Sequence, residues 1–202
     1  MEKIIIATKN KGKLAELEAP LKALGFVVET LPQDYPEIEE NGTSFEENAL
    51  IKARAVAKDL QCITIADDSG ISVNALNGAP GIYSARYGND YELLENETKD
   101  QRNNRKLLDK MKDIPLEKRQ CAFHCAMAAV FPNGREIVAH NTWEGILLTE
   151  AHGINGFGYD PLFFDEELQL TGAEMPKETK MQRSHRAKSL KALIHALGDI
   201  IR

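Results

Sequence analysis

An apolar run that ends in two adjacent carboxylates constrains this chain more than any other feature. The run is Ile63-Thr64-Ile65-Ala66, and it leads directly into Asp67-Asp68-Ser69-Gly70. The run predicts a buried strand, and the Ser-Gly pair predicts a turn directly after the acids. Such a strand points its acids at the carboxyl edge of a sheet, where α/β proteins bind ligands. Neighbouring anions repel each other, so a cation such as Mg²⁺ is expected beside them; a solvated turn is the alternative.

Length and composition exclude several classes of protein. With 202 residues, 43% of them hydrophobic, the chain can form one domain over residues 1–202, which can have two lobes. It has no apolar run long enough to span a bilayer and no secretory-signal layout at its start. Its three cysteines are too few, and odd in number, for a disulfide framework. We therefore expect a soluble, cytoplasmic protein without a membrane partner. A net charge of -6 argues against nucleic acid as a partner, whereas local lysines can still bind a small polyanion.

The order of apolar patterns predicts a mixed α/β domain with a mixed sheet. A helix is expected after the first strand, with an apolar stripe of Leu14, Leu17, Leu21 and Leu24 and with Pro20 kinking or interrupting it. Further helices are expected over residues 44–60, 92–112 and from Ser184 onward. Strands are expected at 3–7, 26–31, 63–66, 71–73, 120–131 and 135–148, the last two forming a hairpin at Pro132-Asn133-Gly134. Loops are expected at 32–42 and 170–183.

The turn after the first strand is rich in lysine. It reads Thr8-Lys9-Asn10-Lys11-Gly12-Lys13, at the start of the first expected helix. A helix N-terminus carries partial positive charge, so lysines there are unfavourable unless the turn binds an anion such as a phosphate. The spacing is not that of a Walker A loop, and a lysine-rich surface turn is the alternative.

A second set of polar residues lies on and before the helix at 44–60. Asn48 and Lys52 are four residues apart and share a face, where Lys52 can reach a phosphate and Asn48 can fix a neighbouring loop. Upstream, the turn Glu39-Glu40-Asn41-Gly42 offers a second source of carboxylates. Carboxylates from two separate loops are a plausible Mg²⁺ site for a nucleoside triphosphate, although an acidic loop by itself is usually just solvated.

Two further segments suggest recognition of a flat ligand. In residues 153–161, glycines flank Phe157, which can stack on a ring while Asp160 accepts hydrogen bonds; a core position for Phe157 is the alternative. Ser184 is an expected N-cap, and Arg186 in the first turn opposes the helix dipole and therefore needs a specific partner. By contrast, Cys121 and Cys125 read as buried thiols rather than zinc ligands, because His124 faces the other side of a strand.

Taken together, these segments resemble the Ham1-like inosine triphosphate pyrophosphatases. The resemblance runs from Ala7 to Leu193, nearly the whole chain, and six motifs follow the family's order. Arg183, Asn141 and Pro20 depart from the family pattern, and Arg183 can alter the base pocket. The motifs lie at residues 7–13, 44–49, 66–70, 78–87, 156–161 and 184–186.

The resemblance implies a role for each matched position. Glu40 and Asp68 correspond to Mg²⁺ ligands, Asp68 also to the proton acceptor, and Ser69 to a substrate contact beside it. The implied fold is an elongated two-lobed one with the active-site cleft between the lobes, assembled as a homodimer. The triphosphate-binding set is Thr8, Lys9, Asn10, Lys11, Gly12, Lys13 and Lys52, and the base-binding set is Phe157, Gly158, Tyr159, Asp160, Lys180, His185 and Arg186.

The implied activity is hydrolysis of aberrant purine nucleotides (ITP, dITP, XTP) to the monophosphate and pyrophosphate. From the residues alone, the prediction is a metal-assisted phosphohydrolase; attack at the α-phosphorus comes from the resemblance. Donors such as Arg186 favour a 6-oxo group over the amino group of adenine, which leaves the exclusion of guanine unexplained. The alternatives are a Maf-like pyrophosphatase for modified pyrimidines, a nucleotide-binding module without hydrolysis and, least favoured, a structural protein. Whether Asp67 shares the base role also stays open.

Overall fold

The structure is a computed structural model that describes residues 2–32 and 34–201, with side chains described as far as Gly198. The chain divides into two compact units. Unit 1 comprises the chain up to Asp68, Cys125–Asn141 and the chain from His185 onward; unit 2 comprises Ser69–His124 and Thr142–Ser184. The described residues contain no helix both long and apolar enough to cross a bilayer.

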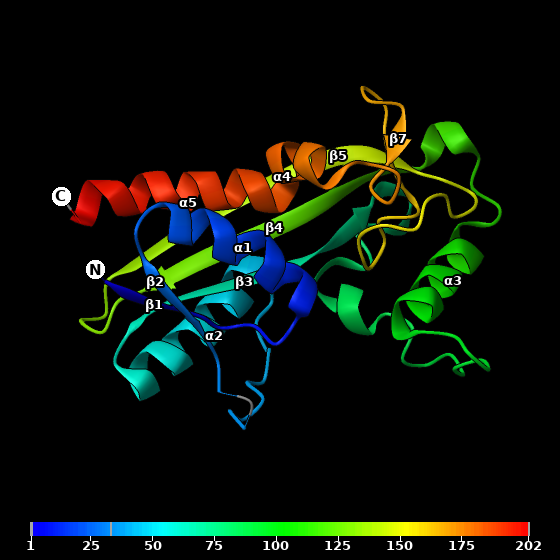
Figure 1. Cartoon of the computed structure of the whole chain (residues 1–202). Helices are drawn as coiled ribbons and strands as arrows, with labels where there is room; N and C mark the ends of the chain where they lie inside the picture. The colour runs from blue at the N-terminus through cyan, green and yellow to red at the C-terminus, as the bar shows by residue number, and fades with distance from the viewer. Residues whose placement is uncertain (1, 33, 202) are drawn as a thin grey trace. The chain divides into compact units, whose positions relative to one another are not determined.

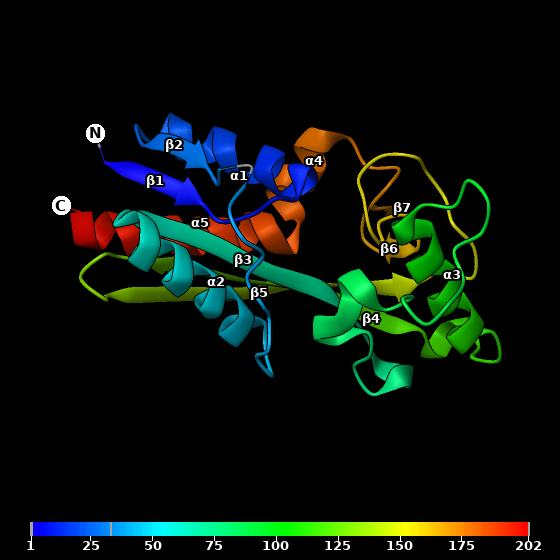
Figure 2. The same cartoon turned by 90° about the horizontal axis from the view of Figure 1, so that it is seen from below.

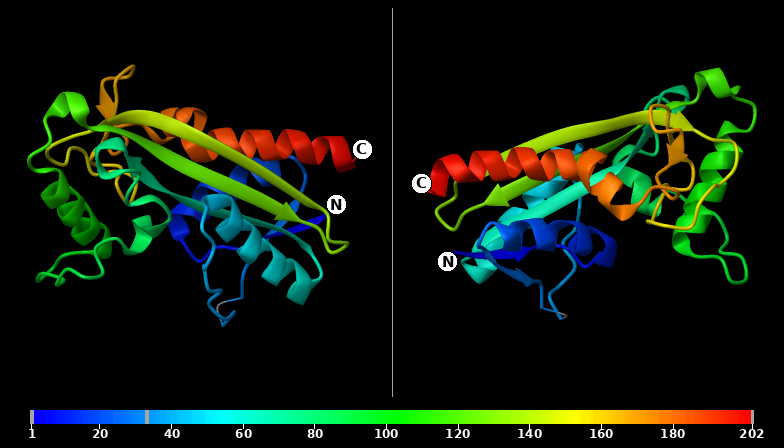
Figure 3. Two further views of the ribbon diagram at one scale, coloured as in Figure 1. Left: turned by 180° about the vertical axis from the view of Figure 1, so that it is seen from behind. Right: turned by 45° about the horizontal axis from the view of Figure 1, so that its top comes forward.

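One mixed sheet contains the seven strands that the described residues form, in the order β2-β1-β3-β4-β5-β6-β7. β1 (Lys3–Ile6) pairs in parallel with β2 (Val27–Thr30) and with β3 (Ile63–Val73). β4 (Gln120–Val130) and β5 (Glu136–Leu147) form the expected hairpin, seen in Figure 3, and β6 (Phe163–Asp165) pairs antiparallel with β5 and with β7 (Leu170–Thr171). The predicted mixed α/β fold is confirmed.

Three helices cover the strands of unit 1. α1 (Lys11–Ala23) and α5 (His185–Ile201) lie beside each other on one face, and α2 (Phe45–Leu60) lies on the other (Figures 1 and 2). Ser44 starts α2 by accepting the amide of Glu47 at 3.1 Å, as its N-cap position predicts. The core between the sheet and α1 and α5 consists of Ile4, Ile6, Leu17, Leu21, Ile63, Ile65, Cys125, Met127, Ala129, Leu190, Leu193 and Leu197.

Unit 2 is built around the far ends of the long strands and two helices, α3 (Lys99–Met111) and α4 (Lys177–Arg183). Short 3-10 helices occupy Asn74–Leu76, Gly81–Arg86 and Leu116–Lys118. Its core includes a cluster of three aromatic rings, in which Phe163 lies 4.6 Å from Trp143 and 4.7 Å from Phe123, centroid to centroid. Leu107 and Met111 pack from α3 into the same core.

The prediction of a turn directly after the two carboxylates is wrong. β3 continues through Asp67, Asp68, Ser69 and Gly70 as one strand of 11 residues to Val73. Gly70 serves a close approach rather than a turn, because a Cβ there would lie 2.4 Å from the Ser84 Oγ. The acids therefore lie in the middle of a strand, beside the carboxyl end of β1, where the Ala7 amide donates to the Ile65 carbonyl at 2.7 Å.

Three other expectations also need correction. The helix expected at 92–112 begins only at Lys99, because Thr98 and Gln101 form a capping box, and Leu93 and Leu94 before it are exposed. The loop expected at 170–183 contains β7 and α4, since the proline at 176 starts a helix instead of breaking one. Of the two effects expected of Pro20, kinking or interruption, interruption is wrong, because α1 runs on to Ala23.

Candidate active site

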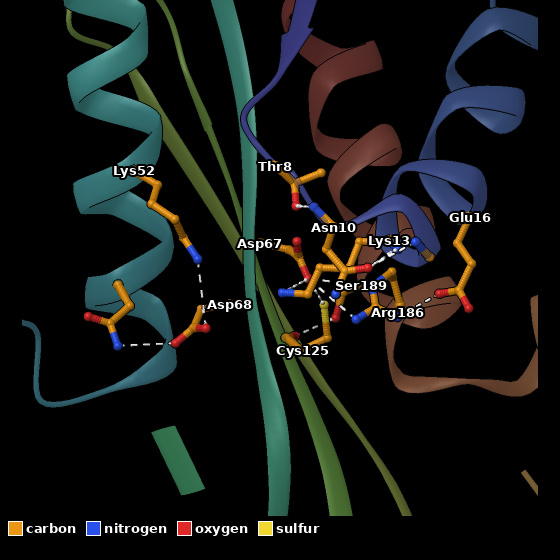
Figure 4. A network of polar contacts seen from close by, with 12 residues as sticks. Thr8, Asn10, Lys13, Glu16, Lys52, Asp67, Asp68, Cys125, Arg186 and Ser189 are labelled. Carbon is orange, nitrogen blue, oxygen red and sulfur yellow. Dashed lines mark hydrogen bonds and ion pairs between the residues drawn. The ribbon is translucent and has the colours of Figure 1, made fainter. Parts of the chain in front are cut away.

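Asp67 and Asp68 project to opposite faces of β3, as successive residues of a strand must. Figure 4 shows Asp68 on the side of α2 and Asp67 on the side of α1 and α5. The side chain of Asp67 is 0% exposed and that of Asp68 is 8% exposed. The two carboxylates therefore meet different partners although they are neighbours in the chain.

Asp67 is the centre of a buried ion network. Its Oδ2 lies 3.0 Å from the Lys13 Nζ and 3.4 Å from the Arg186 Nε, and the Arg186 Nη1 lies 2.5 Å from Glu16. Burial alone would raise the pKa of Asp67, but Lys13 and Arg186 hold it well below its ordinary range. The pKa of the neighbouring Cys125 thiol is raised to about 12 by burial, so this cysteine is a neutral core residue. The partner expected for Arg186 is thus a pair of carboxylates, Asp67 and Glu16.

On the opposite face, the surroundings of Asp68 compensate its negative charge more weakly than those of Asp67 do. Its Oδ2 accepts a hydrogen bond of 3.1 Å from the Asn48 amide, and its Oδ1 lies 3.7 Å from the Lys52 Nζ. Burial raises the pKa of Asp68 above the ordinary value in spite of the positive charge of Lys52. A carboxylate with a raised pKa takes up a proton more readily, which is what a general base requires.

Lys52 joins Asp68 to the acidic loop before α2. Its Nζ lies 2.6 Å from the Glu40 Oε1, while Asn48 accepts a hydrogen bond of 2.8 Å from the Gly42 amide. Burial alone would lower the pKa of Lys52, but the surrounding carboxylates, Asp68 first among them, raise it. The prediction that Asn48 fixes a neighbouring loop is confirmed.

Glu40 and Asp68 can hold a metal ion together, because a single ammonium already lies near both carboxylates. Among the described residues, no group of three or more His, Cys, Asp or Glu is arranged to bind a metal. A pair of carboxylates suits Mg²⁺, which keeps several waters and binds substrate phosphates in its remaining positions.

The lysine-rich turn begins α1 with its own cap. Asn10 Oδ1 accepts the amides of Gly12 and Lys13 at 2.9 and 3.1 Å, and the Thr8 hydroxyl accepts the Asn10 amide. Lys9 donates to the Tyr35 carbonyl at 2.6 Å, and Lys11 is exposed. The helix start of unit 1 therefore presents cations next to the Asp67 face.

The glycine-rich segment of unit 2 is held in place by hydrogen bonds and an ion pair of its own residues and of Lys180. Asp160 accepts the Phe157 amide at 2.8 Å and pairs with Lys180 at 2.5 Å, and the Lys180 Nζ lies 5.2 Å from the Phe157 ring centroid. Gly156 has a φ of +75°, and a Cβ there would lie 2.0 Å from Asp160. The Tyr159 hydroxyl donates to the Ser84 carbonyl at 2.8 Å, so its ring is a core element.

The predicted site residues thus fall into two groups. In unit 1, Glu40, Lys52 and Asp68 lie on the α2 side of β3. The lysine-rich turn and the start of α5, where His185 and Arg186 are buried, lie on the other side. Unit 2 brings together Phe157, Gly158, Tyr159, Asp160 and Lys180, and it begins with the half-buried Ser69.

Residues that no motif singles out complete each group. In unit 1 these are Glu16, which pairs with Arg186, and Tyr35, whose hydroxyl donates to Asp59 at 2.8 Å. In unit 2, Asp100 accepts the Gly158 amide at 2.7 Å and Asn104 donates to the Gly158 carbonyl at 3.1 Å. All of these contacts join residues far apart in the sequence, Glu16 and Arg186 being 170 residues apart, so no local spacing signals them.

Comparison with known proteins identifies the family. The model of the Ham1 family matches residues 4–196. This chain belongs to the Ham1 family. The resemblance inferred from the six motifs is therefore confirmed.

Relatives of this Ham1 chain match it over nearly their whole length. A dITP/XTP pyrophosphatase of Nitratidesulfovibrio vulgaris is 48% identical over 95% of this chain and 93% of its own, and one of Vibrio vulnificus is 46% identical over 98% of both. Among solved structures, the Staphylococcus aureus Ham1 protein is 38% identical with a TM-score of 0.85, over 98% of this chain and 99% of its own. The Mycobacterium abscessus nucleoside-triphosphatase (dITP/XTP pyrophosphatase) is 41% identical with a TM-score of 0.75, over 96% and 99%.

Proposed function

We propose that this Ham1 protein hydrolyses dITP, XTP and ITP to the nucleoside monophosphate and pyrophosphate. The observation that carries the proposal is the pairing of Asp68 and Glu40 at one ammonium, in a chain whose relatives are dITP/XTP pyrophosphatases. Removal of such nucleotides protects the nucleotide pool from damaged purines.

Asp68 acts as the general base, taking a proton from the water that attacks the α-phosphorus. Its raised pKa supports this role, since a base is most effective when its pKa approaches the working pH. Asp67 does not share the role: it stays ionised as the counter-ion of Lys13 and Arg186. Glu40 and Asp68 would hold Mg²⁺, which would supply positive charge to neutralise the phosphate oxygens.

The triphosphate is bound by Thr8, Lys9, Asn10, Lys11, Gly12, Lys13 and Lys52, and Ser69 contacts the substrate beside the base. Four of these are lysines, which suits a polyanion. The base is bound by Phe157, Gly158, Tyr159, Asp160, Lys180, His185 and Arg186, where donors select the 6-oxo group that adenine lacks.

A substrate panel tests the proposal. Pyrophosphate release from dITP, XTP, ITP, ATP and GTP is measured with Mg²⁺ and with a chelator. Release from the first three alone, abolished by the chelator, is the expected result. Release of orthophosphate, equal use of ATP, or binding without turnover contradicts it.

We further propose that the protein works as a homodimer in the cytoplasm, where its nucleotide substrates are made. Its three cysteines are unpaired, which suits a reducing compartment. Sedimentation analysis that finds a monomer at micromolar concentration contradicts the dimer.

A further inference from the structure

Lys52 occupies the position between the two carboxylates assigned to the metal. Its ammonium lies 2.6 Å from Glu40 and 3.7 Å from Asp68, and Figure 4 shows it directed at Asp68 from α2. The Lys52 side chain is 12% exposed, so this ion pair is largely withdrawn from water. An ammonium and Mg²⁺ bound to the same two carboxylates would repel each other strongly at this depth.

We propose that Lys52 is a resident counter-ion that Mg²⁺ displaces, and that the displaced ammonium then moves onto the triphosphate. The inference rests on the proposed metal and substrate and concerns what this lysine does before they bind. In the nucleotide-free protein the ammonium neutralises Glu40 and Asp68, which would otherwise repel each other.

The geometry permits such an exchange. Asn48 fixes Asp68 and the Gly42 amide, so the carboxylate side of the site is held in place when the lysine leaves. Lysine is a point charge on a flexible stem, which lets it exchange one anionic partner for another. Metal entry releases Lys52 toward phosphate, and phosphate draws Lys52 away from the metal ligands, so each ligand strengthens binding of the other.

Mg²⁺ binding by the nucleotide-free protein tests the proposal. Lys52→Gln removes the competing charge, so we expect the variant to bind Mg²⁺ at least about tenfold more tightly than wild type in calorimetric titration, and an analogue of the triphosphate more weakly. Lys58→Gln is the matched control, because Lys58 is an exposed lysine on the same helix, and it should bind Mg²⁺ as wild type does. Equal or weaker Mg²⁺ binding by Lys52→Gln overturns the proposal.

A second measurement uses the unmutated protein, in case Lys52→Gln does not fold. Acetylation of each lysine is followed by mass spectrometry while Mg²⁺ is added. We expect the rate at Lys52 to rise several-fold and that at Lys58 to stay constant. A Lys52 rate that does not respond to Mg²⁺ overturns the exchange.

Nucleotide hydrolysis, measured in parallel, separates the two proposals. If wild type releases pyrophosphate from dITP but the Mg²⁺ titrations show no effect of Lys52, only the exchange fails. If no nucleotide is hydrolysed, the proposed function fails, and the titrations still decide the exchange.

Discussion

The two faces of β3 shift the pKa of an aspartate carboxyl in opposite directions. On one face, Asp67 is enclosed by Lys13 and Arg186, and its pKa is lowered; on the other, Asp68 has Lys52 and a neutral amide, and its pKa is raised. Both carboxylates are buried, so burial alone does not separate them. The neighbouring charges do, because Asp67 lies beside Lys13 and Arg186, whereas Asp68 has Lys52 together with the anionic Glu40. One acid is thereby part of the scaffold, and the other is available for chemistry.

The sharpest test of this difference is Asp68→Asn. We expect kcat for dITP to fall about 10³-fold, since a general base contributes 10²–10⁴-fold. Stability at neutral pH should not fall, because burial disfavours the charge that the substitution removes. Pyrophosphate release and chemical unfolding measure the two effects. A rate near that of wild type would show that Asp68 is not the base.

Asp67→Asn should have its main effect on stability. Removal of this charge leaves Lys13 and Arg186 facing a neutral group inside the protein, and loss of one partner of a buried pair costs about 3–5 kcal/mol. Urea unfolding measures the difference from wild type. A cost below about 1 kcal/mol would mean that the network around Asp67 is not a stabilising scaffold.

The contribution of Asp67 should also depend on pH. Its pKa in the folded protein lies below that of a free aspartate, about 3.9, so its stabilisation is complete above this pH and is lost as the pH falls toward the folded value. The difference in unfolding free energy between wild type and Asp67→Asn should therefore shrink below about pH 4. Unfolding curves from pH 6 to pH 2.5 measure it. A difference that grows in acid would reverse the assigned direction.

The smallest effect is expected at Glu18, a partly exposed carboxylate that also forms an ion pair. Glu18 lies 2.5 Å from Lys22 one helical turn along α1, and the two side chains are 37% and 55% exposed. Glu18→Gln should change the unfolding free energy by less than about 0.5 kcal/mol. An effect as large as that of Asp67→Asn would mean that burial does not set the difference between these pairs.

Local signals predicted much of the fold and, in unit 1, that Asn48 holds a loop and that Arg186 has a specific partner. The apolar periods predicted the bounds of α2, β4 and β5 to within a residue or two. The unfavourable position of Arg186 at a helix start correctly predicted a specific partner. The identity of that partner was not readable, because Asp67 and Arg186 are 119 residues apart.

One error came from a local preference that tertiary contacts overrule, and another from an apolar pattern that a local helix cap overrules. Ser69-Gly70 has the composition of a turn, yet the strand continues because Ser84 packs against Gly70 and its hydroxyl accepts the Ile71 amide at 2.9 Å. Leu93 and Leu94 have the spacing of a buried helical face, but the capping box at Thr98 begins the helix after them. The continued strand cannot be derived from a short window of sequence, whereas the capping box is a local signal in Thr98 and Gln101 that outweighs the apolar pattern before it.

Asn48 sets a limit on how this site can evolve. One end of its amide accepts from the Gly42 amide and the other donates to Asp68, so the group has a fixed polarity. An aspartate of the same shape would turn an anion toward Asp68, and a glutamine would lengthen the spacer by one carbon. Gly42 is equally restricted, because a Cβ there would lie 2.7 Å from the Asn48 Oδ1. Substitution at either position therefore requires a compensating change at the other, so positions 42 and 48 should vary together or not at all.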